Sequence, residues 1–402
     1  MNSVPSLFPN FNAAFFWTVA ILAVLGGITM LLVFLVGRRA LREHRIRRYD
    51  ELALKIHNQW RDIVKGGVPA ETWRKDPMQC EIVQSIIVQE IGAATDKDRA
   101  GLQDFLRSTG LIDLCIEKVK GGHGWARRRA ILALGAMRVP EAIAPLAEAL
   151  DDWQLATRMA AMQGLGRTAL AEAAEPIIET FMVGGLKVPL DPITNALVRC
   201  YYDQPAAILP YLRRSRGESR ELLARVASEL AVAEMADEMI VLAEDPQAEV
   251  RAAAAKALVV APLPLAIPAL GDLARDGVWF VRLRATSALG EIRHPRTIPI
   301  LLEAVRDSNR LVRMRAAATL ARFERDRVEI LQSIVDSRDR YALHAMISAL
   351  ELGGGFEQTL KELSDPLLHN ETAERLLTAL REGAAGLWTT RPADPVVESV
   401  FP

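Results

Sequence analysis

The chain has 402 residues, of which half are apolar and only 6% are aromatic, and its formal net charge is −1. Alanine and leucine carry most of the hydrophobicity, which favours closely packed helices over a β-sheet. Residues 38–48 hold six arginines and one glutamate, a local charge of +5, and residues 1–37 hold no charge, so the total of −1 leaves −6 for residues 49–402. This mildly acidic body argues against nucleic acid as a partner.

The N-terminal region predicts a membrane anchor. Residues 15–36 are an uninterrupted apolar and uncharged run, which as a helix is about 33 Å long and crosses a bilayer. A cleaved signal peptide is the alternative, but it has a basic start and a shorter apolar core, whereas here the basic cluster follows the run. We therefore expect a transmembrane helix over 15–36, preceded by a short extracytoplasmic segment over 1–14.

A basic juxtamembrane stalk is predicted over residues 37–65. Its membrane-interface arginines are Arg38, Arg39, Arg42, Arg45, Arg47 and Arg48. By the positive-inside rule they predict a single-pass protein of the bacterial inner membrane, with its N-terminus outside and its body in the cytoplasm. They are interpreted as topology determinants that contact headgroups, and a specific anionic-lipid site is the alternative. Apolar residues at helical spacing from Tyr49 to Ile63 indicate that the helix continues until Gly66 and Gly67 stop it.

The segment over residues 79–124 predicts two or three helices that form an N-terminal helical cap. The three cysteines, Cys80, Cys115 and Cys200, are odd in number, lie far apart and lack zinc-ligand spacing. They are interpreted as small buried residues in a reducing compartment.

A 31-residue period runs through residues 125–340. The arginines on one register of this period are Arg127, Arg158, Arg220, Arg251, Arg282 and Arg313, and Pro189 breaks the series. Leucine follows most of these arginines by seven residues, and Gly135, Gly166 and Gly290 come next to such leucines. A period of this size predicts a stack of similar helical units. In the unit at 276–308 we expect one helix over 281–290, ended by its glycine, and a second over 298–305.

A second regularity links these arginines to aspartates six residues earlier. The residues of this predicted structural ladder are Asp152 and Arg158, Asp245 and Arg251, Asp276 and Arg282, and Asp307 and Arg313. An aspartate in a turn and an arginine at the start of the following helix can bond within and between units, and we expect Asp276 to be a partner of Arg282.

This pattern resembles that of HEAT repeats, in the short bacterial form also seen in phycobilisome-lyase-type proteins. The segments 249–258, 281–290 and 312–320 carry the resemblance, which covers about residues 125–340. It implies an all-α fold, a right-handed α-solenoid of antiparallel helix pairs, in which the Asp/Arg ladder is structural.

The ends of the array depart from the pattern. Near Pro189 the repeated Val-Arg start is lost, so the stack is expected to bend or change pitch there. Residues 341–382 keep helical periodicity but slip in register, which predicts a degenerate C-terminal repeat or cap. Residues 383–402 are rich in glycine, proline and small residues and predict a flexible tail.

No sequence motif indicates a reaction. None of the six histidines is followed by glutamate, unlike the paired His-Glu dipeptides of HEAT-repeat hydroxylases that bind a di-iron centre, and H-E-x-x-H, Cys-x-x-Cys, P-loop and G-x-S-x-G patterns are missing. We therefore expect no enzymatic activity, no cofactor, no metal site and no small-molecule substrate. A lyase or lyase-chaperone-type module acting on a protein substrate is the alternative.

The surface beside the ladder supplies the candidate partner-binding residues, which are Lys256, Trp279, Phe280, Arg284, Arg315 and Arg322. The HEAT resemblance implies that the charged ones face the concave side, where they would grip an acidic or extended peptide. Trp279 and Phe280 are expected in the turn before Arg282. The alternative is a solvated face for the charges and inter-unit packing for the aromatics. The leading hypothesis is a membrane-anchored cytoplasmic scaffold that holds a protein of a membrane-associated complex.

Overall fold

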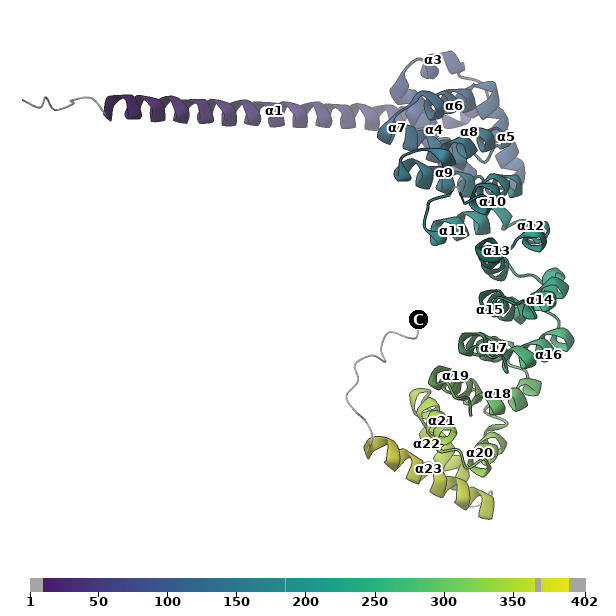
Figure 1. Cartoon of the computed structure of the whole chain (residues 1–402). Coiled ribbons are helices and arrows are strands. Elements are labelled where there is room, and N and C mark those ends of the chain that lie inside the picture. Colours follow the sequence, from purple (N-terminus) through teal and green to yellow (C-terminus); the bar gives the residue numbers. More distant parts are fainter. Residues whose placement is uncertain (1–9, 185, 366–369, 390–402) are drawn as a thin grey trace, which may run out of the picture. The chain divides into compact units, whose positions relative to one another are not determined.

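The computed structural model describes residues 10–184, 186–365 and 370–389, and all regular structure in these ranges is helical (Figure 1). The all-α solenoid predicted from the sequence is confirmed. The chain divides into two compact units, Met1–Glu117 (unit 1) and Lys118–Pro402 (unit 2). The outermost parts of the predicted N-terminal segment and tail, residues 1–9 and 390–402, lie outside the described residues.

A single long helix, α1 (Asn10–Asn58), contains the predicted membrane span. Its 49 residues correspond to about 74 Å. Apolar side chains within the span, from Phe15 to Val36, are exposed, and within the described residues α1 is the one helix long and apolar enough to cross a membrane. The helix begins at Asn10, inside the segment predicted to precede the span.

The base of α1 belongs to the folded part of unit 1. A turn at Gln59 interrupts the helix seven residues before the stop predicted at Gly66. Ile56, at the end of α1, and Ile63, in the short α2 (Trp60–Val64), are nevertheless both buried, as the helical spacing predicts.

Four further helices complete unit 1 and lead out of it: α3 (Ala70–Arg74), α4 (Pro77–Ala93), α5 (Asp96–Ser108) and α6 (Leu111–Gly121). The Asp76 carboxylate accepts a hydrogen bond from the Met78 amide and so caps α4, and it also lies 3.6 Å from the guanidinium of Arg48 on α1. Trp73 stacks on Phe105 with ring centroids 6.2 Å apart. The residues predicted as a stalk and those predicted as a cap therefore share one core.

Unit 2 is a stack of antiparallel helix pairs, whose two rows are visible in Figure 1. In each repeat the first-row helix comes first along the chain, at the register of the periodic arginines. The first row consists of α7 (Gly124–Ala136), α9 (Leu155–Thr168), α11 (Leu190–Tyr201), α13 (Gly217–Glu229), α15 (Ala248–Ala257), α17 (Trp279–Ile292), α19 (Arg310–Leu320) and α21 (Arg340–Leu352). The second row consists of α8 (Ile143–Glu148), α10 (Ala174–Met182), α12 (Leu209–Arg214), α14 (Ala236–Ala243), α16 (Leu263–Leu273), α18 (Ile298–Ala304), α20 (Arg327–Asp336) and α22 (Phe356–Leu363).

Short 3₁₀ turns lead from the first row into the second or extend a helix end. They span Pro140–Ala142, Ala149–Asp151, Ala171–Ala173, Pro205–Ile208, Ala233–Met235, Leu258–Val260 and Pro295–Thr297. Three of them start with proline, whose fixed φ suits a first helical position and whose missing N–H is not needed there.

The repeated glycines do not end the first-row helices, contrary to the sequence prediction. Those helices run on for a residue or more, and the left-handed residue that follows is Arg138, Ala169 or Arg293, with φ of 53°, 51° and 49°. A Cβ built on Gly135 would lie 2.1 Å from the Gly164 carbonyl oxygen on α9, and one on Gly166 would lie 2.8 Å from the Ala196 Cα. The glycines are therefore required for close approach of neighbouring first-row helices.

The C-terminal region continues the helix-pair packing further than predicted. The helices α21 and α22 form a last pair, although the register has slipped, and α23 (Glu371–Thr389) packs on α20, α21 and α22. The flexible tail predicted from residue 383 is thus wrong for residues 383–389, which are the last part of α23.

Replacing a glycine at a helix contact tests this close approach. We expect Gly135→Ala to destabilise unit 2 by about 1–3 kcal/mol, because the new methyl group meets rigid backbone and the helices must move apart. In Gly290→Ala the methyl group meets the Thr319 side chain, which can rotate, so a smaller loss is expected. Thermal unfolding followed by circular dichroism compares the two. Equal melting temperatures for Gly135→Ala and the wild type would contradict the packing role.

Candidate protein-binding surface

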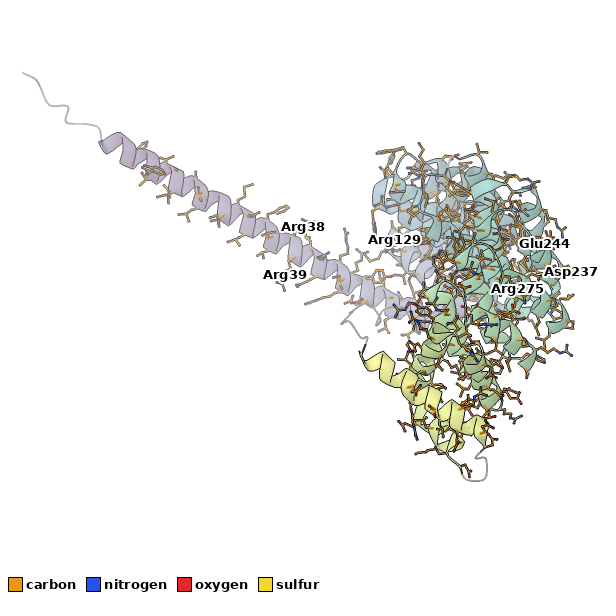
Figure 2. The ribbon with its side chains drawn as sticks, turned by 60° about the horizontal axis from the view of Figure 1, so that its bottom comes forward. Arg38, Arg39, Arg129, Asp237, Glu244 and Arg275 are labelled. Carbon is orange, nitrogen blue, oxygen red and sulfur yellow. The ribbon has the colours of Figure 1, made fainter. Side chains whose placement is uncertain are left out.

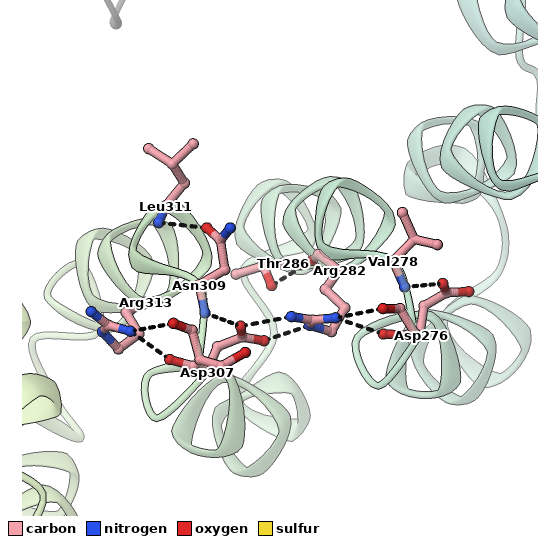
Figure 3. A network of polar contacts seen from close by, with 10 residues as sticks. Asp276, Val278, Arg282, Thr286, Asp307, Asn309, Leu311 and Arg313 are labelled. Atoms are coloured by element: carbon pink, nitrogen blue, oxygen red, sulfur yellow. Dashed lines mark hydrogen bonds and ion pairs between the residues drawn. The ribbon is translucent and has the colours of Figure 1, made fainter.

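The ladder arginines Arg251 and Arg282 each join two consecutive inter-helix turns. The Nη1 of Arg282 donates to the carbonyl oxygens of Asp276 and Gly277, in the turn before its own helix, at 2.8 and 3.4 Å. Its Nε and Nη2 donate to the two carboxylate oxygens of Asp307, in the next turn along the stack, at 2.6 and 2.9 Å (Figure 3). Arg251 repeats this geometry with the carbonyl of Asp245 and the carboxylate of Asp276.

The pairing differs from the sequence prediction in one respect. The carboxylate of Asp276 is the partner of Arg251, while Arg282 uses only the main-chain carbonyl of Asp276. The six-residue interval therefore marks a main-chain contact, and the ion pair spans 25 residues, from each arginine forward to the next turn. That interval also identifies two arginines left out of the predicted ladder, Arg127, which pairs with Asp152, and Arg220, which pairs with Asp245.

Burial and hydrogen bonding set the protonation of this ladder. The Asp276 and Arg251 side chains are only 10% and 17% exposed. The hydrogen bond from Arg251 lowers the pKa of Asp276 more than burial raises it, and the Val278 amide adds to the lowering. At Asp307 burial is the largest influence and raises the pKa, but the bonds from Arg282 and the Asn309 amide outweigh it, so the pKa is again lowered. Both carboxylates therefore stay ionised at neutral pH.

The ladder is interrupted around α11. Val183 and Arg214 occupy the two positions where the period would place an aspartate, and Pro189 occupies the arginine position. Arg158 has no carboxylate ahead of it and donates instead to the Lys187 carbonyl, at 3.0 Å. At the other end of the stack the guanidinium of Arg313 lies over the Tyr341 ring, 5.3 Å from its centroid.

The two rows of unit 2 carry opposite charge. Apart from the ladder arginines, the first-row α-helices have ten basic and seven acidic residues, whereas the second-row α-helices have four basic and eleven acidic ones. Exposed charges of both rows point into solvent, as Arg129 on the first row and Asp237 on the second show (Figure 2). An acidic ligand is therefore favoured on the first row and repelled by the second.

The four charged candidate residues follow one stripe of the first row, on which Lys256, Arg284 and Arg322 are exposed and Arg315 is half-buried. On α17 the stripe runs through Arg284 and Glu291, which are exposed, with half-buried Ser287 between them. Arg284 and Arg315 share one repeat position, and Arg322, seven residues after Arg315 and in the turn after α19, holds the repeat position of Glu291. Lys256 holds the Ser287 position on α15 and pairs with Glu229 on α13 at 2.6 Å.

The two aromatic candidates lie at the start of α17. Trp279 and Phe280 are the first residues of α17, not part of the preceding turn as predicted. Their rings meet edge to face with centroids 6.0 Å apart, and Trp279 remains 42% exposed. Trp279 precedes Arg284 by five residues, about 140° around the helix. Phe280 precedes Arg284 by four residues, about 40° around the helix, so it continues the charged stripe toward the start of α17, whereas Trp279 does not.

The three cysteines are all buried, and none of them is in a disulfide. Burial raises the pKa of the Cys200 thiol to about 12, so the reactive thiolate is disfavoured at neutral pH. The described residues contain no cluster of three or more His, Cys, Asp or Glu side chains arranged to hold a metal ion.

Comparison with known proteins agrees with this architecture. The family model for HEAT repeats matches residues 112–181 and 267–351. No curated protein matches the sequence. Among solved structures, the chain is similar to human deoxyhypusine hydroxylase in complex with glycerol, with 19% identity, a TM-score of 0.27, and coverage of 61% of this chain and 96% of that one.

Two further solved structures are similar at the same level. An engineered protein has 16% identity and a TM-score of 0.33, with 80% of this chain and 99% of that chain covered. The complex of CpcE and CpcF of phycocyanin lyase from Nostoc sp. PCC7120 has 16% identity and a TM-score of 0.23, with 60% and 88% covered. These likenesses are too distant to carry an argument about activity.

Removing one ladder carboxylate tests the ion pair. We expect Asp276→Ala to lower the stability of unit 2 by about 1–3 kcal/mol, because the largely buried Arg251 then loses both of its side-chain acceptors. Asp272→Ala is the matched control, since Asp272 is an exposed carboxylate on the neighbouring α16. Urea denaturation followed by circular dichroism measures both variants. Equal midpoints for Asp276→Ala and Asp272→Ala would show that the ladder charge is merely solvated.

The pH dependence of the same pair has a definite sign. Because the pKa of Asp276 is lowered in the folded protein, the unfolded chain binds more protons in acid, and stability falls with falling pH. The contribution is full above about pH 4, the ordinary range of aspartate, and is lost as pH falls through the lowered folded-state pKa. We expect the stability difference between wild type and Asp276→Asn to be constant above that pH and to shrink below it. A stability difference that grew as the pH fell would show that folding raises the pKa of Asp276 instead of lowering it.

Proposed function

The chain belongs to the HEAT-repeat proteins, and on that premise we propose that it is a membrane-anchored scaffold that binds an acidic, extended segment of a partner protein along the first row of unit 2. The observation that carries this proposal is the opposite charge of the two helix rows. A partner with exposed carboxylates gains from contact with one row only, so it is oriented as well as bound.

The geometry of the stripe suits an extended ligand. Arg284 on α17 and Arg315 on α19 hold the same position in successive repeats, so they recur at the spacing of the stack. Arginine presents a planar fork of donors that binds carboxylates in pairs, which favours a partner chain with acidic residues at intervals along its length. Glu291 lies on the same stripe and would repel an acidic residue placed opposite it. The partner would therefore bind with its acidic residues aligned with the arginines and not with Glu291.

The anchor completes the proposal. The exposed apolar surface of α1 between Phe15 and Val36 needs a nonaqueous environment, and a bilayer supplies one. The arginines from Arg38 to Arg48 follow it directly and place the body in the cytoplasm by the positive-inside rule. In this proposal residues 15–36 span the membrane, residues 79–124 form the N-terminal helical cap, and residues 125–340 carry the binding row.

A topology experiment tests the anchor. We expect a reporter enzyme that is active only outside the cytoplasm to be silent when fused after Pro402 in bacterial cells, and active when fused before Asn10. The reverse pattern would overturn the orientation. Deletion of residues 1–37 should release the protein from the membrane and leave the rest of the chain folded, with its thermal unfolding transition retained, because the described contacts of unit 1 involve the end of α1 beyond that segment.

Charge reversal tests the binding row. We expect Arg284→Glu with Arg315→Glu to reduce recovery of the partner from native membranes at least tenfold, since carboxylates then face carboxylates. The matched control is Arg296→Glu with Arg306→Glu, which makes the same charge change at exposed positions that flank second-row α18.

The readout is a pull-down with quantified partner yield, alongside melting curves and nuclease treatment. Melting temperatures within a few degrees of wild type show that the variants fold. Equal partner yields from the two double variants would show that the stripe is ordinary solvated surface. If nuclease treatment of the wild type causes the same loss of partner as the stripe variant, the partner is held through nucleic acid and not through a protein contact. The lyase-type alternative would be indicated by a recovered partner that is covalently modified in the presence of the wild type alone.

A further inference from the structure

One edge of unit 2 exposes large apolar side chains next to basic ones. Trp125 begins α7, Trp153 lies in the turn before α9, and Leu155 begins α9, and these side chains are 67%, 85% and 50% exposed. Val183, at the end of α10, is 86% exposed. We call these four residues the tryptophan edge. Their exposure costs free energy in water, which marks a surface that is covered in the cell.

The ladder places these residues side by side. Arg127, two residues after Trp125, binds the carboxylate of Asp152, the residue before Trp153. Arg158 then donates to the Trp153 carbonyl at 3.2 Å and to the Lys187 carbonyl at 3.0 Å. Two guanidinium groups thus hold the start of α7, the turn before α9 and the loop after α10 at one edge of the stack. Rigid backbone contacts, not chance rotamers, project the side chains outward.

Basic side chains surround the edge. The end of α6 is drawn to it by the bond from Arg127 Nε to the Val119 carbonyl, at 2.7 Å, and carries exposed Lys118 and Lys120. The guanidinium of Arg129 lies 5.3 Å from the Trp125 ring centroid. The first turns of α7 and α9 contain no acidic residue. Asp151 is the one exposed carboxylate that directly adjoins the Trp153 turn.

We propose that the tryptophan edge rests on the headgroup layer of an anionic bilayer. Tryptophan favours the interface between water and hydrocarbon, where its ring is partly buried and its N–H stays hydrated. Each lysine or arginine near an anionic surface adds about 1 kcal/mol of attraction. This inference rests on the proposed membrane anchor, which holds the edge at high effective concentration near lipid.

The shape of the tryptophan edge favours a lipid surface over a protein partner. Tryptophan hot spots in protein interfaces sit in a closely packed ring of other residues that excludes water. Here Trp125 projects from the start of α7 and Trp153 from the turn before α9, both mostly exposed, and the Arg129 guanidinium lies over the Trp125 ring. Lipid headgroups can surround such side chains without a matching rigid surface.

Hydrogen–deuterium exchange of the full chain in lipid nanodiscs tests the proposal. One nanodisc contains phosphatidylcholine alone and the other contains added phosphatidylglycerol. We expect amides of residues 153–157 and 125–129 to exchange more slowly with phosphatidylglycerol, and high salt to remove the difference. Trp125→Ser with Trp153→Ser should abolish the protection, whereas Trp279→Ser with Leu311→Ser, two exposed positions at the starts of α17 and α19, should retain it.

The outcomes separate this inference from the anchor on which it rests. Protection of residues 15–36 together with unchanged exchange at the tryptophan edge would overturn the edge proposal and leave the anchor intact. Free exchange of residues 15–36 would overturn the anchor, and this inference with it. Protection at the edge that requires an added protein fraction and is indifferent to phosphatidylglycerol would assign the edge to a protein partner and also overturn the proposal.

Discussion

Unit 2 depends on a guanidinium group that bonds two consecutive turns at once. Arg282 reaches back to the carbonyl of Asp276 and forward to the carboxylate of Asp307, so one side chain fixes the spacing between neighbouring repeats. Lysine cannot replace it, because the contact needs several donors fixed in one plane. The aspartate is equally specific, because its second role is to accept from the amide two residues on, as Asp307 does from Asn309. The aspartate thus stabilises both the charge of the arginine and the geometry of its own turn.

The ladder works together with close helix packing. Glycines such as Gly135 allow neighbouring first-row helices to approach until backbone meets backbone, and alanines fill most of the remaining contact. In a solenoid each repeat contacts only its neighbours, so a defect stays local. The gap in the ladder at Val183, Pro189 and Arg214 therefore weakens the two junctions of α11 without affecting the bonds further along the stack.

The ladder also decides which surfaces remain for function. It occupies the edge where the turns meet the starts of the first-row helices, and it neutralises most of the arginines on the periodic register. The basic residues left over form the stripe through Arg284 and Arg315, around the helix from the ladder. The tryptophan edge lies directly over the ladder near α7 and α9. In the two proposals the peptide and the membrane therefore use different parts of the first row, the stripe at α17 and α19 and the edge at α7 and α9.

The sequence by itself determined the repeat, the apolar registers and the all-α class, because a 31-residue period repeats the same burial pattern in every unit. It also determined the apolar run at 15–36 and which residues form the ladder edge. Only the tertiary structure decided which side chains of the ladder bond to each other. The carboxylate of Asp276 bonds Arg251 of the preceding repeat, whereas Arg282, six residues on, bonds the Asp276 main-chain carbonyl. Gly135 serves packing and not helix ending, since the close contact with Gly164 exists only once the helices are stacked. The turn at Gln59 and the extension of α23 to Thr389 follow from packing within their own units, and local composition does not encode them.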